Sequence, residues 1–213
     1  MKYYPVFLDL HDQPCLVIGG GTVAERKVVS LIDAGADVTV ISPALTPTLH
    51  DLAHGGRISH REKIFEDRDI NEFFLVIAAT DSPEVNTGVA RLCRNRRVPV
   101  NVVSPPDKSS FIVPSLVERG ELLIAVSTCG ASPALSRKIR KDLQKQYGPE
   151  YDIFLQRLTV LRKRVLDEVT DENVRRNIFQ MIVDSDVIDL LRQGKINEAE
   201  LRMLTVAGLK YQP

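Results

Sequence analysis

The first half of the chain alternates short apolar runs with segments of helical periodicity. The apolar runs are rich in β-favouring residues and predict buried strands at 15–18, 38–41, 75–79 and 98–103. Between them, apolar residues recur every three or four positions and predict helices at 22–34, 45–52 and 85–93. Such alternation forms βαβ units, so we expect a parallel sheet covered by helices on both faces. The opening stretch, 6–10, is expected to add an edge strand.

The pattern changes after residue 103. A polar loop at 104–110 precedes two β-like stretches, 111–113 and 122–126, which are separated by a polar turn at 118–121. A basic helix is expected over 135–147, and the chain from residue 150 onward has helical periodicity throughout. We therefore predict an α/β protein with a Rossmann-like, doubly wound parallel sheet, a small β–helix connector and an all-helical C-terminal domain. The predicted bounds are 1–113, 114–148 and 149–213.

Composition narrows the class of protein without indicating a reaction. The 213 residues are 44% hydrophobic and 26% charged, which suffices for a buried core. The 28 basic and 28 acidic residues cancel, which argues against a nucleic-acid-binding protein. No apolar run approaches the roughly 18 residues of a membrane span, and the N-terminus lacks the apolar region of a secretion signal. Cys15, Cys93 and Cys129 form neither a disulfide framework nor a zinc motif, so we expect a reducing cytoplasm.

A glycine-rich segment joins the first predicted strand to the first helix. Gly19-Gly20-Gly21-Thr22-Val23-Ala24 fits G-x-G-x-x-A, the pattern of dinucleotide-binding turns. Gly19 permits a tight turn, Gly21 lets the backbone approach a pyrophosphate, and Ala24 allows close helix–strand packing. The start of the helix then offers free N–H groups to the phosphates. Dinucleotide binding is the favoured interpretation, and a purely structural turn is the alternative.

The acidic residue that holds the ribose in many such domains is missing. It is expected roughly 20 positions further on, where the second strand ends in Ile41-Ser42-Pro43-Ala44. We therefore expect backbone groups and Ser42 to hold the ribose, and charge does not decide between NAD and NADP. Thr80 and Asp81 follow the third strand, at the edge of the sheet where ligands bind. Two interpretations stay open for Asp81: it caps the next helix, or it lines the cofactor cleft.

Further segments follow the glycine loop in a characteristic order. They are Gly-Gly-Gly-Thr-Val-Ala-Glu-Arg-Lys at 19–27, Ala-Ala-Thr-Asp at 78–81 with Asn86, Asn-Val-Val at 101–103, Ser-Phe-Ile-Val-Pro-Ser at 110–115 and Ala-Val-Ser-Thr-Cys-Gly-Ala-Ser-Pro at 125–133. Together they resemble the precorrin-2 dehydrogenase/sirohydrochlorin ferrochelatase family of sirohaem synthesis. The resemblance extends over essentially the whole chain, the helical tail included.

The resemblance implies a fold, a reaction and a partner. It makes 1–113 an NAD-binding Rossmann domain, 114–148 a dimerisation region and 149–213 a helical domain, in a protein that acts as a homodimer. The implied reaction converts precorrin-2 and NAD to sirohydrochlorin and NADH. Some members are fused to a methyltransferase that makes precorrin-2. This chain ends at Pro213, so we expect another polypeptide to supply that activity.

The resemblance, together with the residue patterns at the strand ends, indicates the site residues. The expected cofactor-binding residues are Gly19, Gly21, Thr22, Val23, Ser42, Pro43, Ala44, Thr80 and Asp81. The expected substrate-binding residues are Ser110, Thr128, Gly130, Ser132 and Arg137. Members that also insert iron carry an Asp directly after Asn-Val-Val, where this chain has Ser104, with Asp107 three residues on; we take both as candidate catalytic residues. A serine hydroxyl is a poor base at neutral pH, so the change affects iron insertion more than dehydrogenation.

Two other functions fit parts of this sequence, and two further groups of residues have competing interpretations. The same dehydrogenase with added ferrochelatase activity is one alternative. A non-catalytic dinucleotide-sensing module is another, which accounts for the Rossmann half but not for the motifs after Val103. The basic helix 135–147 is either a solvated face or a contact surface for substrate carboxylates. His50 and His54 lack a nearby third ligand, so we interpret them as surface residues and predict no metal site.

Overall fold

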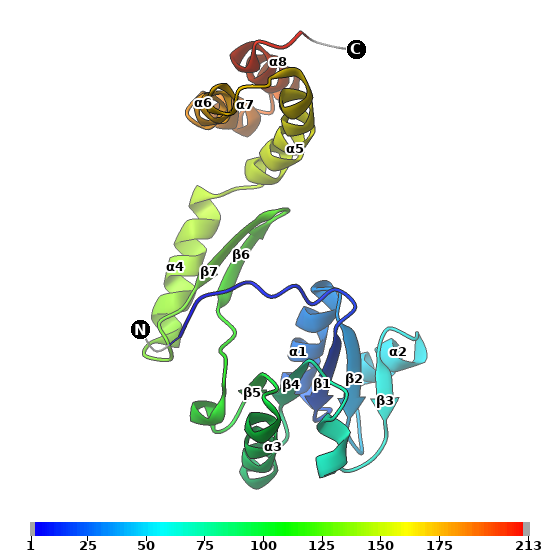
Figure 1. The fold of residues 1–213 in the computed structure, drawn as a ribbon. Helices are drawn as coiled ribbons and strands as arrows, with labels where there is room; N and C mark the ends of the chain where they lie inside the picture. The colour runs from blue at the N-terminus through cyan, green and yellow to red at the C-terminus, as the bar shows by residue number, and fades with distance from the viewer. Residues whose placement is uncertain (1–2, 211–213) are drawn as a thin grey trace. The chain divides into compact units, whose positions relative to one another are not determined.

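The computed structural model describes residues 3–210 (Figure 1). Contacts divide the chain into two compact units, residues 1–113 and residues 114–213, and each has its own secondary structure. The boundary lies at the end of the loop that follows the last strand of the first unit. A further division of the second unit at residue 148 stays a prediction.

The first unit contains a five-stranded, all-parallel sheet in the order β3-β2-β1-β4-β5. Its strands are β1 (Pro14–Ile18), β2 (Asp37–Ile41), β3 (Ser59–Arg61), β4 (Leu75–Ala78) and β5 (Val100–Val102). Its helices are α1 (Thr22–Asp33), α2 (Pro47–His54) and α3 (Pro83–Arg96), with short 3₁₀ turns η1 (Asp67–Ile70) and η2 (Pro106–Lys108). The strand order reverses between β1 and β4, which is where open α/β sheets bind ligands.

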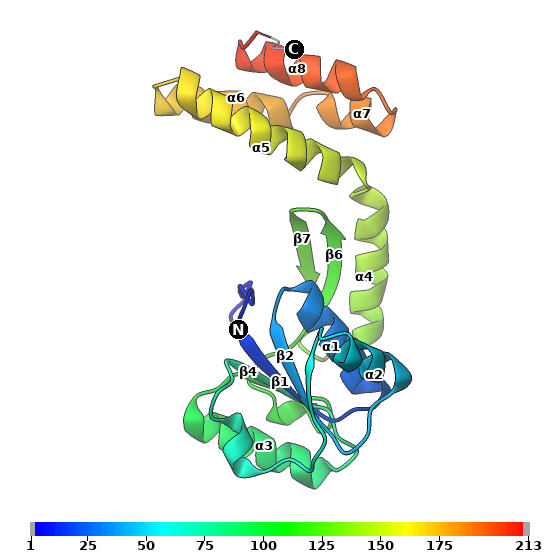
Figure 2. The same ribbon diagram turned by 90° about the vertical axis from the view of Figure 1, so that its right-hand side faces the viewer.

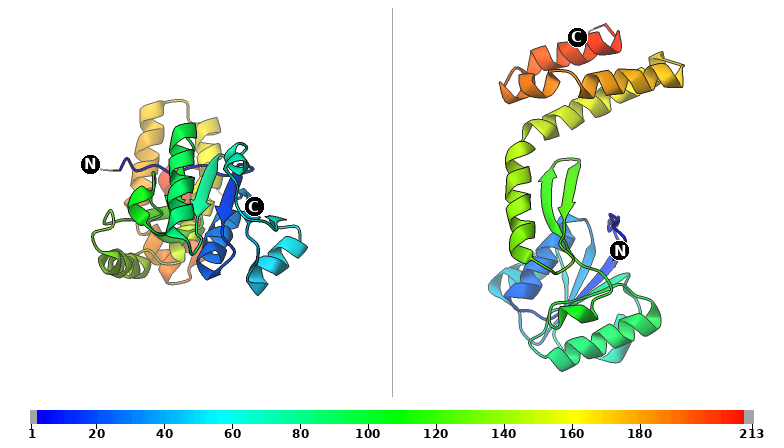
Figure 3. Two further views of the ribbon diagram at one scale, coloured as in Figure 1. Left: turned by 90° about the horizontal axis from the view of Figure 1, so that it is seen from below. Right: turned by 90° about the vertical axis from the view of Figure 1, so that its left-hand side faces the viewer.

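Helices cover both faces of this sheet, as the continuous apolar runs predict. Alternate residues of β1 point to opposite sides: Cys15 and Val17 pack with α1 and α2, whereas Leu16 and Ile18 pack with α3. Figures 2 and 3 show α3 on the side of the sheet opposite to α1. All of β1 after Pro14 is at most 1% exposed, so this central strand anchors the loop that leaves its carboxyl end.

One edge strand of the first unit was predicted wrongly, and another was not predicted. Residues 6–10 form no strand, and Val6 and Phe7 are exposed. The sheet edge beside β2 is formed instead by β3, whose sequence Ser59-His60-Arg61 is polar. An edge strand is buried on fewer sides than a central one, so polar residues are tolerated there and no apolar run marks it.

The second unit begins with an antiparallel hairpin, β6 (Ser115–Arg119) and β7 (Leu122–Val126). The strand predicted at 111–113 is therefore wrong: Phe111 packs against the core of the first unit, and its carbonyl accepts a hydrogen bond from the Asn101 amide. The true strand includes Glu118 and Arg119, which were expected in the turn. Gly120 and Glu121 form the two-residue turn, and Gly120 has a φ of 56°, which favours glycine.

Five helices complete the described part of the second unit. They are α4 (Pro133–Gln146), α5 (Glu150–Glu168), α6 (Glu172–Val183), α7 (Val187–Arg192) and α8 (Ile196–Ala207). The last four enclose an apolar core that includes Phe154, Val165 and Ile182. At the start of α5, the buried Glu150 carboxylate accepts a hydrogen bond of 2.8 Å from Arg192 Nε. This ion pair ties α5 to α7.

One buried side chain joins the loops at the carboxyl ends of β4 and β5. Asn86 on α3 is fully buried, and its Oδ1 accepts hydrogen bonds from Thr80 N (3.2 Å) and Thr80 Oγ1 (2.8 Å). Its Nδ2 donates to Thr80 O (3.0 Å) and to Ser104 O (2.9 Å). All of its hydrogen-bonding groups are used, so Asn86 fixes the spacing of the two loops.

We predict that Asn86→Ala lowers the free energy of unfolding by about 2–3 kcal/mol, because backbone groups of Thr80 and Ser104 lose the fully buried amide that pairs with them. Asn95 is exposed on the same helix, and Asn95→Ala is expected to change it by less than about 0.5 kcal/mol. Urea unfolding of both variants checks this, and equal effects would contradict it.

Candidate functional site

A cleft of about 560 Å³ opens at the carboxyl ends of β1, β2, β3 and β4. It lies wholly within the first unit. Its walls come from four segments: the glycine loop after β1, the loop after β2, the loop after β3 and the loop from β4 to the start of α3. The lining residues are Ile18–Gly21, Ile41–Thr46, Lys63–Phe65, Ala79–Ser82 and Val85.

The glycine loop lies closer to its neighbours than any side chain permits. A Cβ added at Gly19, whose φ is +117°, would collide with the Ala79 carbonyl. A Cβ at Gly20 would collide with the Ala44 carbonyl and lie 2.7 Å from Ser42 Oγ. At Gly21, by contrast, no atom lies within 4 Å of such a Cβ. The first two glycines therefore permit close packing of the loop, whereas the third leaves space at the start of α1.

The N-terminus of α1 differs from those of its neighbours. Thr46 and Ser82 cap α2 and α3, and their hydroxyls accept hydrogen bonds from backbone N–H groups. Gly21 precedes α1, and no described side chain caps that helix. The first-turn N–H groups and the positive end of the helix dipole thus remain available to an anion. The close glycine loop and this uncapped helix fit the pyrophosphate of a dinucleotide.

Ser42 has a structural role that the sequence does not reveal. Its buried hydroxyl donates a hydrogen bond of 2.7 Å to Ala44 O, which closes the turn at Pro43. Its carbonyl lies 2.9 Å from His60 Nε2, which links the ends of β2 and β3. Ser42, Pro43 and Ala44 all line the cleft. That they hold the ribose stays a prediction.

The residues after β4 have two roles: Ser82 caps helix α3, and Thr80 and Asp81 form part of the cleft wall. Ser82 caps α3 by accepting a hydrogen bond of 3.2 Å from Val85 N, so the cap interpretation of Asp81 is wrong. Asp81 and Thr80 line the cleft. The Thr80 hydroxyl is 2.8 Å from Asn86 Oδ1, so the same side chain that joins the loops also positions this wall.

Thr22 and Val23 do not line the cleft but begin α1 directly beside it. The sequence reasoning missed three lining residues on the loop after β3: Lys63, Ile64 and Phe65. They were missed because β3 itself is polar, and no apolar run marks where that loop begins. Gly20 was also missed, since the motif allows any residue there, although this chain has space for none but glycine.

The two candidate catalytic residues and Ser110 lie on the loop after β5 and are not among the residues lining the cleft. Ser104 is exposed, and its carbonyl accepts from Asn86. Asp107 pairs with Lys108 at 3.1 Å, and this hydrogen bond lowers the pKa of the Asp107 carboxyl. The Ser110 hydroxyl accepts a hydrogen bond of 2.8 Å from Val100 N, which gives a partner to a backbone group of the edge strand β5.

The remaining substrate candidates gather at the start of α4, in the second unit. Ser132 caps the helix by accepting from Leu135 N, and Ser132 N donates to Thr128 Oγ1 at 3.0 Å. Gly130 has a φ of +89° and open space around it. Arg137 lies one turn further along α4, and its exposed side chain donates a hydrogen bond to Pro133 O. Their contact with a substrate stays a prediction.

Within residues 3–210, His, Cys, Asp and Glu side chains nowhere gather in a group of three or more that would hold a metal ion. Among the described helices, none has both the length and the apolar character needed to cross a membrane.

Comparisons with known proteins agree with this geometry. A family model described as "Putative NAD(P)-binding" matches residues 6–115, and one described as "Sirohaem biosynthesis protein central" matches residues 119–146. The siroheme synthase of Methylococcus capsulatus is 40% identical over 207 residues, which are 97% of this chain and 44% of the relative. The siroheme synthase of Photobacterium profundum is 37% identical over 206 residues, with the same coverage. The chain thus spans less than half the length of these relatives.

A solved structure is similar over both units. "SirC, precorrin-2 dehydrogenase" has a TM-score of 0.79 and 27% sequence identity. The match covers 95% of this chain and 100% of that chain. The similarity therefore includes the second unit as well as the sheet with its cleft.

We predict that substitution of two neighbouring glycines affects different properties, stability at Gly20 and NAD affinity at Gly21. Gly20→Ala forces a Cβ into the Ala44 carbonyl and is expected to lower the free energy of unfolding by about 1–3 kcal/mol. Gly21→Ala is expected to leave stability within about 0.5 kcal/mol of the wild type, because its Cβ meets nothing. The new Cβ occupies the space for the pyrophosphate, so NAD affinity should fall about tenfold or more.

Urea unfolding and calorimetric titration with NAD check both variants. Gly88→Ala on α3 is the matched control, because its Cβ also meets nothing and it does not line the cleft. It should leave NAD affinity unchanged. Unchanged NAD affinity in a folded Gly21→Ala variant would mean that the glycine loop is only a structural turn.

Proposed function

The chain belongs to the NAD(P)-binding family of sirohaem biosynthesis that includes precorrin-2 dehydrogenase, and we propose that it catalyses the NAD-dependent conversion of precorrin-2 to sirohydrochlorin. The similarity to a precorrin-2 dehydrogenase over both units carries this proposal. The glycine loop and the uncapped α1 support it, because they supply a place for the cofactor phosphates.

In this reaction precorrin-2 loses two electrons and two protons. NAD supplies the chemistry of hydride acceptance at its nicotinamide ring. The chain binds the cofactor through the N–H groups at Gly21 and the first turn of α1, and the apolar side chains of Ile18, Ile41 and Leu45 exclude water from the cleft. The second proton leaves to solvent or to a nearby base. Asp81 is the one acidic side chain lining the cleft within the described chain.

Two polar segments are proposed to bind the substrate. The loop after β5 carries Ser104, Asp107 and Ser110, and the turn before α4 carries Thr128, Gly130 and Ser132. Precorrin-2 bears many carboxylate side chains, and hydroxyl groups, backbone N–H groups and arginine bind carboxylates well. The exposed guanidinium of Arg137 supports a role for α4 in this contact.

We propose that the protein acts in the cytoplasm. All three cysteines are free, and Cys15 and Cys93 are buried in β1 and α3. Burial raises the pKa of both thiols to about 11, so these two side chains stay protonated and serve the core. A chain with reduced cysteines suits a reducing compartment. Microscopy of a fluorescent fusion in the source cell, with signal confined to an envelope compartment, would contradict it.

The reaction itself is tested by incubating purified protein with precorrin-2 and NAD. We expect NADH absorbance to appear together with the spectrum of sirohydrochlorin. Gly21→Asp is the control, because it places a carboxylate where the pyrophosphate is expected. Ferrous ion added afterwards should enter slowly, since Ser104 offers a neutral hydroxyl in place of a carboxylate base. A protein that binds NAD yet leaves precorrin-2 unchanged would be a sensing module instead.

We propose a homodimer formed through one face of the hairpin. Cross-strand pairing places Leu116 and Leu123 on the same face, and both are more than 40% exposed, whereas Val117 on the other face is fully buried. Light scattering at micromolar concentration should give twice the chain mass, and Leu123→Glu should give a monomer. Leu166→Glu on α5 alters a similarly exposed leucine and should remain dimeric. A monomeric wild type would contradict the proposal.

A further inference from the structure

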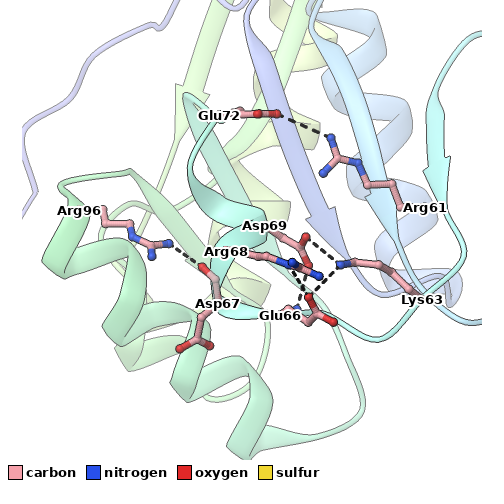
Figure 4. Close-up of polar contacts among 8 residues, drawn as sticks. All are labelled: Arg61, Lys63, Glu66, Asp67, Arg68, Asp69, Glu72 and Arg96. Atoms are coloured by element: carbon pink, nitrogen blue, oxygen red, sulfur yellow. Dashed lines mark hydrogen bonds and ion pairs between the residues drawn. The ribbon is translucent and has the colours of Figure 1, made fainter.

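A cluster of charges holds the loop after β3 against the η1 turn. Figure 4 shows Lys63 reaching toward Asp69 and Glu66. We call these three residues the β3–η1 clamp. Lys63 Nζ lies 2.9 Å from Asp69 Oδ1 and 3.4 Å from Glu66 Oε2. Glu66 N donates a hydrogen bond of 2.8 Å to Asp69 Oδ2, and Arg68 Nε donates one of 2.7 Å to Glu66 Oε2.

Asp69 is the buried centre of the clamp, with its side chain only 6% exposed. Burial by itself would raise the pKa of this carboxyl, but the bond from Lys63, the N–H of Glu66 and the charge of Arg61 together lower it. Asp69 is therefore ionised at neutral pH. A buried carboxylate without a partner is strongly destabilising, so Asp69 holds the Lys63 ammonium in place.

The clamp lies beside the part of the cleft where the adenosine ribose is expected. That ribose lies at the end of the second strand of such a sheet, which is here the turn at Ser42. Ser42 N donates to the Arg61 carbonyl at the end of β3, and Lys63 follows two residues later. Lys63, Ile64 and Phe65 line the cleft together with that turn. In the described chain, Lys63 is the one cationic side chain among the lining residues.

NAD and NADP differ by a phosphate on this ribose, and a cleft that prefers NADP needs an available cation beside it. Resting on the proposed function, we propose that Asp69 makes the cleft select NAD over NADP by holding Lys63 away from the 2′ position of the ribose. Lys63 cannot pair with a 2′-phosphate without leaving the buried Asp69 carboxylate with no paired cation and only the Glu66 N–H as a donor. Selection thus arises although the acidic ribose-binding residue is missing. Asp69 is a positioning residue that acts through Lys63.

The test is calorimetric titration of the purified protein with NAD and with NADP, which needs no precorrin-2. We expect the wild type to bind NAD more tightly. Asp69→Asn keeps the shape and an acceptor for Glu66 N but removes the buried negative charge, so that only the half-exposed Glu66 still attracts Lys63. It should therefore lower the ratio of the NADP to the NAD dissociation constant by about tenfold, as expected for one charge-assisted hydrogen bond. The double variant Asp69→Asn/Lys63→Met should restore the wild-type ratio.

Glu72→Gln is the matched control, because it removes a nearby acidic group that pairs with Arg61 at 3.9 Å and does not line the cleft. It should leave the ratio unchanged. If Asp69→Asn does not fold, Glu66→Gln decides the question: this half-exposed side chain also holds Lys63, and its loss should shift the ratio the same way by a smaller factor.

Three results would overturn the proposal: an unchanged ratio in a folded Asp69→Asn, an unchanged ratio in Glu66→Gln where Asp69→Asn does not fold, or a wild type that binds NADP as tightly as NAD. If Asp69 had only a structural role, Asp69→Asn would weaken the binding of NAD and of NADP by the same factor. Failure of the proposed function gives a different result, in which NAD does not bind or precorrin-2 is not oxidised.

Discussion

The cleft depends on a backbone contact that excludes every side chain. Gly19 lies against the Ala79 carbonyl and Gly20 against the Ala44 carbonyl, so the loop after β1 touches the loops after β4 and β2 at once. Strand β1 fixes the start of that loop, because it pairs with both β2 and β4 and is buried on both faces. The start of α1 is thereby fixed as well, with its N–H groups at the cleft.

The sequence predicted the central elements because burial leaves a strong pattern. β1, β2 and β4 are apolar throughout or nearly so, and helices α1 and α3 bury one face each. The same reasoning failed where burial is partial. β3 is polar and was missed, whereas the apolar residues Val6, Phe7 and Leu8 are exposed and form no strand. A hydrophobic pattern indicates burial. At the edge of a sheet a segment can form a strand without being buried, so the pattern does not reveal it.

The site was predictable where glycine is required by geometry and less so where hydroxyl residues occur. Ser42, Ser110 and Thr128 were all expected to contact ligands, yet each hydroxyl is engaged with a neighbouring group of the chain. Loops leave backbone groups without sheet or helix partners, and short hydroxyl side chains satisfy them locally. A serine in a loop can therefore either contact a ligand or satisfy a nearby backbone group, and the sequence alone does not distinguish these two roles. The contribution of Lys63 was hidden for a related reason, since it follows a strand that no pattern marked.

Charge in the cleft is controlled by pairing as much as by residue type. The chain has a lysine in a cleft that is expected to receive a cofactor, but a buried carboxylate fixes its position. The fixed pair costs desolvation of two charges, and the capping interactions of η1 help to offset that cost by giving Asp69 a further donor. Because η1 packs on the core through the fully buried Ile70, the ion pair is held by the fold rather than by the loop alone. The electrostatics of the cleft near Ser42 and Lys63 therefore follow from the packing of a short turn that contributes nothing to the lining of the cleft.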